Sequence, residues 1–587
     1  MLFAELAETF DRIEAEPSRL AMTSILSEFL KTVESDEIST VIFLSQGKLR
    51  PDFYPQVLGM SDKLVIKALS ATSGLSESKV TEAVVKEGDP GIAAEELIKN
   101  KKQMTLFSNP LTLKRVIKSL TDIEDSEGKD SQNKKTKILS NMLHDSKPVE
   151  ARYLCRIVTG RMRVGAGTMT ILDALAEAFG KKEDRPDLER AFNITCDLGL
   201  VARTIVKEGM DAIREIKVNV GNPLKVMLAE RLRSIPEVVE KLDGKCAMEY
   251  KYDGIRVQAH ITKDSVKLYS RRLEDLTPNF PDIAKSLRER CKVDEAIVEG
   301  ECVAIDQETG NMLPFQEVTH RRKKHGMLEA VEKYPVRIFL FDMLYLDGRD
   351  MTSEPYLERR SSIEKNFEIS ENVQMTTMRI VSSSEEGQRF FDEAIAARCE
   401  GIMAKSISDE SVYRAGSRGF LWIKYKRDYQ QTLVDTFDLA VVGAFYGMGK
   451  RAGTYGALLM AAYDQDGDRF GTACKLGTGF DDEFLEKLPE MLEMYKSQEK
   501  PSSVDAQMIP NVWFEPSVVL EVTGAEISIS PIHTAAMGYA KDDSGLGIRF
   551  PRFTGRVRND KNATECTTYS EMGDMYALQE RDSDGLT

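Results

Sequence analysis

The sequence predicts a three-domain protein that is helical first, mixed α/β next and rich in β-strands near its end. Residues 3–10 and 171–179 repeat apolar side chains at helical spacing. From about residue 216 strand-like runs such as 266–270 mix with helices. The strand-like run 439–445 is followed by glycine-rich turns, a pattern typical of a small β-barrel. We therefore predict domains at residues 1–215, 216–428 and 429–587, the last with a C-terminal tail.

The bulk composition limits the class of protein. A chain of 587 residues is too long for one hydrophobic core, so several domains are expected. No apolar run reaches the length of about 18 residues that a membrane span needs, and the N-terminus does not resemble a signal peptide. The eight cysteines form no C-x-x-C pair, and the five histidines have no metal-binding spacing. We expect an intracellular protein, cytoplasmic or nucleoid-associated, with no zinc site and no membrane partner.

The net charge of −15 argues against general affinity for nucleic acids, but local basic segments remain. In the segment 159–168, glycines and the cations Arg161 and Arg163 link two apparent helices. Glycine-rich backbone at a helix N-terminus can hold phosphate without reading sequence, although an ordinary connecting loop has the same features. We predict DNA contacts here and in a second basic segment, with solvated loops as the alternative. The second segment comprises Arg321, Arg322 and Lys323.

Lys251 is the candidate nucleophile. It follows the buried-strand pattern at 246–248, and Asp253 and Gly254 then turn the chain. A lysine at a strand end is partly desolvated and crowded by other cations, and we expect both effects to lower its pKa and favour the neutral amine. Arg256 offers a fork of donors to a phosphate. The alternative is a surface lysine before a hairpin turn.

Further polar residues recur at the ends of predicted strands downstream of Lys251. Glu299 and Glu301 close the strand-like run 296–298, and alternation places both carboxylates on one face, where they suit Mg²⁺. Phe341 ends an apolar strand and can stack on a purine ring, although such residues are more often part of a core. The other candidates supply charges that either bind phosphate or pair with one another: Arg271, Glu400, Lys405, Arg418, Lys424 and Lys426.

In this order, these residues resemble the motifs of the covalent nucleotidyltransferases, most closely those of the ATP-dependent DNA ligases of archaeal and eukaryotic type. The resemblance covers nearly the whole chain and suggests an archaeal source. The matching segments are 251–254, 270–271, Glu301, 341–342, 400–405, 422–426, 450–456, and 549–553 with 556–561 after it.

The resemblance implies a fold of three parts. They are an all-helical DNA-binding domain, a nucleotidyltransferase (ATP-grasp-like adenylation) domain and an OB-fold β-barrel. It also implies a three-step reaction that joins DNA strands in replication, recombination and repair. The Lys251 amine attacks the ATP α-phosphate and releases pyrophosphate, AMP passes to the 5′-phosphate at a nick, and the 3′-hydroxyl displaces AMP.

The resemblance assigns nucleotide and metal contacts residue by residue. Glu249 matches the position that contacts adenine and Phe341 the position that stacks on it, while Arg549 and Lys561 orient pyrophosphate from the barrel. The implied cofactors are ATP and Mg²⁺, with Mn²⁺ as an alternative, and the implied metal-side carboxylates are Glu301 and Glu400. The full set of implied nucleotide contacts is Glu249, Arg256, Arg271, Glu301, Phe341, Arg418, Lys424, Lys426, Arg549 and Lys561.

The implied partners are nicked duplex DNA and a sliding clamp of the PCNA type, bound by a monomer. Gln103, Leu106 and Phe107 resemble a short clamp-binding box, although an ordinary turn before Pro110 would give the same residues. An RNA ligase and an mRNA-capping guanylyltransferase are alternatives, but neither is expected to carry the helical region. A non-catalytic scaffold that only holds DNA is the alternative from another class. The absence of zinc-finger cysteines disfavours NAD as the nucleotide.

Overall fold

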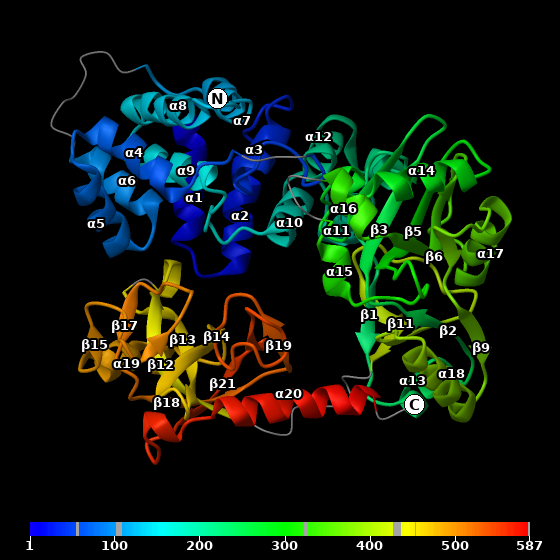
Figure 1. Ribbon diagram of the computed structural model, residues 1–587. Coiled ribbons are helices and arrows are strands. Elements are labelled where there is room, and N and C mark those ends of the chain that lie inside the picture. The colour runs from blue at the N-terminus through cyan, green and yellow to red at the C-terminus, as the bar shows by residue number, and fades with distance from the viewer. Residues whose placement is uncertain (55–57, 101–108, 322–326, 427–435, 452, 585–587) are drawn as a thin grey trace. The chain divides into compact units, whose positions relative to one another are not determined.

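The computed structural model describes residues 1–54, 58–100, 109–321, 327–426, 436–451 and 453–584 (Figure 1). The chain forms two compact units, each considered by itself. The first contains Met1–Ser73 and Ile98–Gln430, and the second contains Gly74–Leu97 and Gln431–Thr587. The domain boundaries near residues 215 and 428 stay predictions.

The N-terminal region is helical, as the apolar spacing predicted. Side-chain oxygens accept hydrogen bonds from backbone amides at several helix starts, for example Ser18 before α2 and Asp197 before α12. In the first unit α2 packs against α10, α3 against α12 and α4 against α8. The helices are α1 (Phe3–Glu14), α2 (Arg19–Leu30), α3 (Ile38–Ser45), α4 (Asp62–Ser73), α5 (Glu77–Glu87), α6 (Pro90–Lys99), α7 (Leu113–Glu124), α8 (Ser131–Asp145), α9 (Pro148–Val158), α10 (Thr168–Phe179), α11 (Arg185–Thr195) and α12 (Leu198–Glu215).

Two sheets follow in the first unit. Their strand orders are β1-β11-β10-β2-β9 and β4-β3-β5-β6-β7, with β8 beside β6. The strands are β1 (Leu228–Arg231), β2 (Cys246–Lys251), β3 (Ile255–Ile261), β4 (Val266–Ser270), β5 (Ala296–Ala304), β6 (Val336–Leu346), β7 (Arg349–Asp350), β8 (Val373–Met375), β9 (Met378–Val381), β10 (Gly401–Lys405) and β11 (Arg418–Lys426). The helices among them are α13 (Ile235–Lys241), α14 (Pro281–Arg290), α15 (Phe315–Thr319), α16 (Met327–Lys333), α17 (Tyr356–Asn366) and α18 (Ser384–Ala396).

Three apolar clusters hold these sheets. One joins β2, β10 and β11 to α13 and α18, and a second joins β3, β4, β5 and β6 to α14. A third contains Ile297 and Phe341 from one sheet and Trp422 from the other, so the two sheets meet there. The strand that was predicted to close after residue 298 continues to Ala304, because Cys302 and Val303 are also buried.

The second unit contains the predicted β-barrel. A curled sheet in the order β15-β17-β12-β13-β14-β16, with β18 and β21 attached, surrounds an apolar core. The elements are β12 (Phe437–Tyr446), β13 (Tyr455–Asp464), β14 (Arg469–Leu476), α19 (Asp482–Glu493), β15 (Lys496–Ser497), β16 (Val504–Asp505), β17 (Val512–Phe514), β18 (Val519–Thr523), β19 (Glu526–Ser530), β20 (Gly545–Arg549), β21 (Arg552–Val557) and α20 (Tyr569–Asp584). The predicted fold class, helical then α/β then β-barrel, is confirmed.

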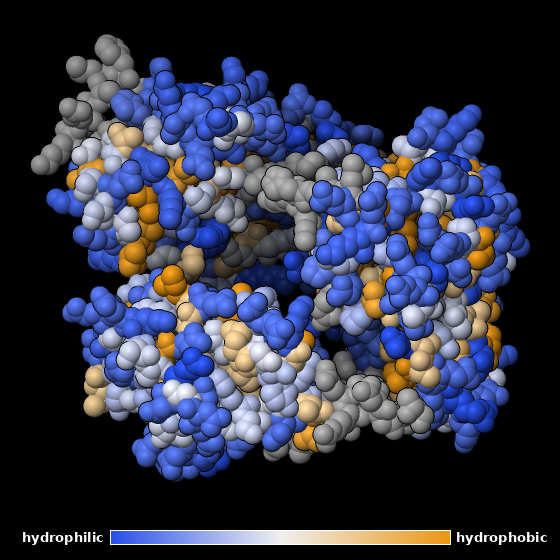
Figure 2. All heavy atoms as spheres, viewed as in Figure 1, coloured by the Kyte–Doolittle hydropathy of each residue, from blue (hydrophilic) through white to orange (hydrophobic). Residues whose placement is uncertain are grey.

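The surface on the face drawn in Figure 2 is mainly hydrophilic, with hydrophobic residues in small groups. Within the described residues, no helix combines the length and the apolar character that a membrane crossing requires. All eight cysteines are buried.

Candidate active site

A pocket of about 820 Å³ lies in the first unit and is lined by strands of both sheets. The strands β2, β10 and β11 contribute one set of its residues, and β3, β4, β5 and β6 contribute another. It brings Lys251 together with most of the predicted nucleotide contacts, although these residues are far apart in the sequence. The predicted residues in its lining are Glu249, Lys251, Arg256, Arg271, Glu301, Phe341, Arg418, Lys424 and Lys426.

Backbone packing fixes the position of Lys251. It is the last residue of β2 and pairs with Gly401 of β10, and its carbonyl accepts a hydrogen bond of 2.9 Å from the Glu400 amide. A Cβ at Gly401 would lie 2.2 Å from the Tyr425 carbonyl oxygen, and one at Gly254 would lie 2.3 Å from the Cys302 carbonyl oxygen. Neither position has room for a side chain, so the backbone on both sides of the nucleophile is held closely.

The Lys251 ammonium forms an ion pair of 2.6 Å with Glu400, which forms a second one of 2.6 Å with Lys426. Burial lowers the pKa of Lys251, but the charges of Glu400 and Glu301 more than offset it, so the pKa is raised. The predicted lowering of this pKa is therefore wrong for the chain without nucleotide. The sequence did not indicate that the charges of Glu400 and Glu301 act on this amine.

The cation crowding that was predicted for Lys251 is found at Lys424. Burial lowers the pKa of this lysine, and the neighbouring charges of Lys426, Lys251, Arg418 and Arg271 lower it further. These five cations therefore share one electrostatic environment. Such a cluster suits a polyanion such as a triphosphate.

Three carboxylates lie near the nucleophile. Burial raises the pKa of Glu301 to about 7, with added repulsion from Glu400 and Asp253. Burial also raises the pKa of Asp253 to about 6, and Glu400 contributes to that rise. At Glu400 burial acts in the same direction, but Lys251 and Lys426 outweigh it and bring the pKa to about 2. Within the described ranges no three acidic, histidine or cysteine side chains are arranged to bind a metal ion directly, so the predicted metal contacts stay predictions.

Phe341 and Trp422 form an aromatic wall, and Arg256 lies against both rings. The Phe341 ring meets Trp422 edge to face at 6.1 Å, and the Arg256 guanidinium lies 5.3 Å from the centre of each ring. Arg256 donates to Glu299 at 2.7 Å and to the Met227 carbonyl at 3.0 Å. Its Nε is buried without a hydrogen-bond partner among the described atoms, which leaves one donor for a ligand.

A buried polar network lies beside this wall. The Glu249 carboxylate, which is 3% exposed, forms ion pairs of 2.7 Å with Lys405 and 2.8 Å with Arg360. It also accepts hydrogen bonds from the hydroxyls of Tyr356 and Thr376. No sequence motif had pointed to Tyr356 or Arg360. The signal that could have found them is the spacing of Tyr356, Arg359, Arg360 and Ile363, which places two arginines on the buried face of α17.

The predicted contacts on the barrel lie in the second unit. Arg549 forms an ion pair of 2.6 Å with Glu526. Lys561 forms one of 2.7 Å with Asp438, which Arg558 also contacts at 2.5 Å. Their predicted roles with pyrophosphate stay predictions.

The predicted DNA and clamp residues have different environments. Arg161 forms an ion pair of 3.1 Å with Asp62, and Arg163 has a left-handed backbone with φ of 54°. Arg321 is buried and donates to both carboxylate oxygens of Asp282 through its two terminal nitrogens, so its predicted DNA contact has no exposed cation behind it and stays a prediction. Five predicted residues lie outside the described part of the chain: Gln103, Leu106, Phe107, Arg322 and Lys323.

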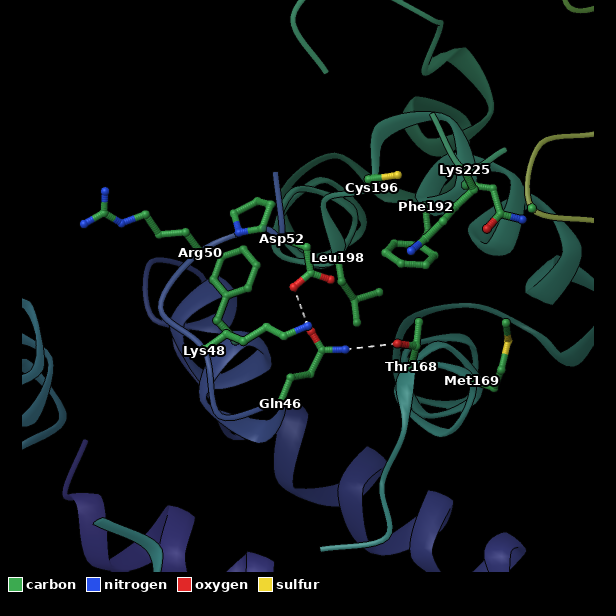
Figure 3. A pocket seen from close by; sticks show the side chains of 14 residues that line it. Gln46, Lys48, Arg50, Asp52, Thr168, Met169, Phe192, Cys196, Leu198 and Lys225 are labelled. Carbon is green, nitrogen blue, oxygen red and sulfur yellow. Dashed lines mark hydrogen bonds and ion pairs between the residues drawn. The ribbon is translucent and has the colours of Figure 1, made fainter. Parts of the chain in front are cut away.

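A second cavity of about 220 Å³ lies in the first unit beside the start of α10 (Figure 3). Figure 3 shows the Gln46 amide directed at the Thr168 hydroxyl, to which it donates at 3.1 Å. Lys48 forms an ion pair of 2.6 Å with Asp52, and the Lys225 ammonium lies 5.5 Å from the Phe192 ring centre. The cavity is thus lined by both polar and apolar side chains, and part of its charge is paired internally.

Comparisons with known proteins agree with this arrangement. The chain matches three family models: "DNA ligase N terminus" at residues 2–176, "ATP dependent DNA ligase domain" at 226–426 and "ATP dependent DNA ligase C terminal region" at 451–561. "DNA ligase 2" of Thermofilum pendens is 47% identical over 99% of this chain and 98% of its own length. "DNA ligase" of Caldivirga maquilingensis is 44% identical over 99% of this chain and 98% of its own length. The solved structure Pmar-Lig_Pre is similar with a TM-score of 0.55 and 16% identity, over 94% of this chain and 99% of that one, a likeness of fold.

Proposed function

The chain belongs to the ATP-dependent DNA ligase family, and from this premise we propose that it seals nicks in duplex DNA through a lysine–AMP intermediate on Lys251. The observation that carries the proposal is the convergence of Lys251, a cluster of cations and the Phe341 ring in one pocket. A nucleotide bound there would stack its base on the aromatic wall and direct its phosphates to the cations. Charge neutralisation around an in-line phosphoryl centre is the main requirement of the reaction.

The first step forms a P–N bond between Lys251 Nζ and the α-phosphate and breaks the bond to pyrophosphate. The lysine must lose a proton, and the charges of Glu400 and Glu301 oppose this loss because they raise its pKa. Any neutralisation of these two carboxylates removes this opposition and favours the neutral amine. Lys424 and Lys426 then offset the charge that develops on the departing pyrophosphate.

Glu301 and Glu400 would hold Mg²⁺, or Mn²⁺ in its place. The fit rests on the chemistry of the pocket, where carboxylate oxygens suit a hard cation. Burial, together with repulsion from Glu400 and Asp253, raises the pKa of Glu301 to about 7, and a bound cation would relieve that repulsion. When bound, the metal supplies charge neutralisation at the phosphoryl oxygens.

The decisive experiment is incubation with α-labelled ATP and Mg²⁺, followed by denaturing separation and then a chase with nicked DNA. We expect wild type to retain the label and release it to the DNA, and Lys251→Arg to retain none. Lys285→Arg is the matched control, since Lys285 is 77% exposed on the same unit. If wild type stays unlabelled even after pyrophosphate has removed any AMP already bound, the catalytic proposal fails and the DNA-holding scaffold becomes the leading function.

We also propose that the 159–168 segment grips the DNA backbone through Arg161 and Arg163. Removing one phosphate contact should reduce the slope of log affinity against log salt by about 0.9. The test is the salt dependence of nicked-DNA binding by Arg161→Gln and by Arg163→Gln. Slopes equal to that of wild type in both variants would remove the segment from the DNA surface.

The clamp proposal concerns Gln103, Leu106 and Phe107. Leu106→Ala with Phe107→Ala should abolish binding to a PCNA-type clamp while sealing of bare nicked DNA continues. Equal clamp affinity in the double variant would rule the segment out. We propose that the chain acts as a monomer inside the cell, in keeping with this role.

A further inference from the structure

Helix α17 carries Arg359 and Arg360 on its buried face. Both donate hydrogen bonds to residues in or next to the nucleotide pocket without lining it themselves. Arg359 is 0% exposed and binds Asp342, the residue after Phe341, through Nε at 2.6 Å and Nη2 at 3.0 Å. Arg360 donates through Nη1 to Glu249 at 2.8 Å and through Nη2 to the Thr376 carbonyl at 2.7 Å. Glu249 and Phe341 line the pocket, whereas neither arginine does. The helix therefore connects the positions of two pocket residues that lie on different sheets.

The hydrogen bonds of Glu249 divide unequally between its two oxygens. Oε1 accepts from the Tyr356 hydroxyl, from Arg360 Nη1 and from Thr376 Oγ1. Within the described chain, Oε2 has Lys405 Nζ at 2.7 Å as its partner. A carboxylate offers about four lone-pair positions, so three donors fill Oε1 and one position on Oε2 stays available.

Lys405 completes the arrangement. Its ammonium has three donors, of which Glu249 takes one and the Phe341 carbonyl, at 3.4 Å, takes a second weakly. Both Glu249 and Lys405 line the pocket, next to Phe341. Among the residues that the structure describes, the pocket wall therefore has one acceptor position on Glu249 and one donor on Lys405 that no side chain or carbonyl occupies.

We propose that Arg360 and Tyr356 of α17 are positioning residues for nucleotide specificity, which hold the Glu249–Lys405 pair as an acceptor and donor that select adenine over guanine. This inference rests on the proposed function, because it takes ATP as the ligand of the pocket. Adenine presents an amino donor at C6 beside an acceptor at N1, which complements Glu249 Oε2 and Lys405 Nζ. Guanine presents an acceptor at C6 beside an N1–H donor, so both contacts become mismatched.

The Tyr356 hydroxyl and the Arg360 guanidinium donate to Oε1 of Glu249 and so hold its carboxylate in one orientation. Without them, Glu249 can turn to pair both of its oxygens with Lys405, and the acceptor and donor lose their fixed positions. A second consequence follows for kinetics: these residues contact the base wall and not the Lys251 cluster, so their loss should change the KM for nucleotide more than kcat.

The test measures the initial rate of Lys251 labelling with α-labelled ATP, GTP, inosine triphosphate and purine riboside triphosphate. Wild type should favour ATP over GTP by about a hundredfold or more, because a site built for hydrogen bonds rejects a mismatched partner strongly. Inosine triphosphate should behave like GTP. Purine riboside triphosphate, which keeps the N1 acceptor and lacks the amino group, should be intermediate.

The variants are Arg360→Lys, which keeps the charge and loses the two-pronged contact, and Tyr356→Phe, which removes one hydroxyl and little volume. We expect the ATP:GTP ratio to fall about tenfold in the first and about threefold in the second, mainly through the KM for ATP. Arg379→Met is the matched control, since Arg379 pairs with Glu393 on the surface of the same unit, at 48% and 46% exposure.

Three outcomes separate the inference from its premise. Wild type that is labelled equally by ATP and GTP overturns the inference. So does an unchanged ATP:GTP ratio in both α17 variants, provided that their circular dichroism matches wild type. If wild type accepts no label from any nucleotide, the proposed function itself fails and the inference fails with it.

Discussion

Lys251 and Lys405 form ion pairs of nearly equal length, at 2.6 and 2.7 Å, but their surroundings shift their pKa values in opposite directions. Burial lowers both pKa values. At Lys251 the charges of Glu400 and Glu301 outweigh burial, so its pKa is raised. At Lys405 burial wins over Glu249 and Asp342, with help from the cation of Arg360, so its pKa is lowered.

The different exposure of the two ion pairs accounts for the different roles of their lysines. The side chains of Lys251 and Glu400 are 21% and 24% exposed, whereas those of Lys405 and Glu249 are 1% and 3% exposed. Lys405 is also enclosed by aromatic rings, with Tyr356 and Trp422 each centred 4.5 Å from its ammonium. A nucleophile must exchange its partner for a substrate, which the open pair permits. The closed pair instead fixes the wall of the pocket.

The largest expected effect is on covalent labelling, which should require Lys251 but not Lys405. Lys251→Arg should reduce covalent labelling by at least about a thousandfold, because guanidinium stays protonated and cannot attack phosphate. Lys405→Met should still be labelled at saturating ATP, with a raised KM. Measurement is by labelling with α-labelled ATP over a range of concentrations. If both variants lost labelling to the same extent, the separate roles of Lys251 as nucleophile and Lys405 as part of the pocket wall would be contradicted.

The next effect concerns stability. Lys405→Met leaves Glu249 buried with one cation fewer, and should lower the free energy of unfolding by about 3–5 kcal/mol, as in other broken buried pairs. Denaturant unfolding followed by circular dichroism measures it. A loss below about 1 kcal/mol would mean that Arg360 alone satisfies Glu249.

A smaller effect should depend on pH at the Lys251 cluster. With a pKa of about 7, Glu301 is mostly ionised at pH 8 and mostly protonated at pH 6. Its ionised fraction therefore falls about tenfold as the pH falls through this window, and cation binding weakens with it. The Mg²⁺ concentration for half-maximal labelling should rise about tenfold at pH 6. An equal requirement at both pH values would remove Glu301 from the metal site.

The smallest expected effect is the loss of stability when the partly exposed ion pair between Lys426 and Glu400 is removed. Lys426→Met leaves Glu400 paired with Lys251, and both side chains of the lost pair are partly exposed, at 23% and 24%. We expect a change in unfolding free energy of about 1 kcal/mol or less, because solvent screens such pairs. The same denaturant series measures it beside Lys405→Met, and an equal loss in the two variants would contradict the contrast.

The fold was predictable where a local pattern determined it. Helical spacing at residues 3–10 and 171–179 predicted α1 and α10, and the run 266–270 matches β4. The end of β5 was missed because Glu299 and Glu301 look like surface residues. In fact Glu299 is fully buried, with Arg256 and Tyr413 as partners. A paired buried charge gives no apolar signal.

The site was predictable in membership and less so in electrostatics. The nucleotide contacts predicted on the middle domain line one pocket. The direction of the Lys251 pKa shift was not predictable, because it depends on Glu400, which is distant in sequence and reaches the amine through pairing of β2 with β10. The burial of Arg321 was not predictable for a related reason, since a basic run does not reveal that one of its members pairs with Asp282.

Gly254 and Gly401, on either side of Lys251, have no room for even a methyl group, since a Cβ would lie within 2.3 Å of a carbonyl oxygen at each. In a saturation mutagenesis screen, these two positions should tolerate fewer substitutions than several of the charged residues around them. An inhibitor that recognises the backbone at this point would therefore leave the enzyme few single-codon routes to resistance.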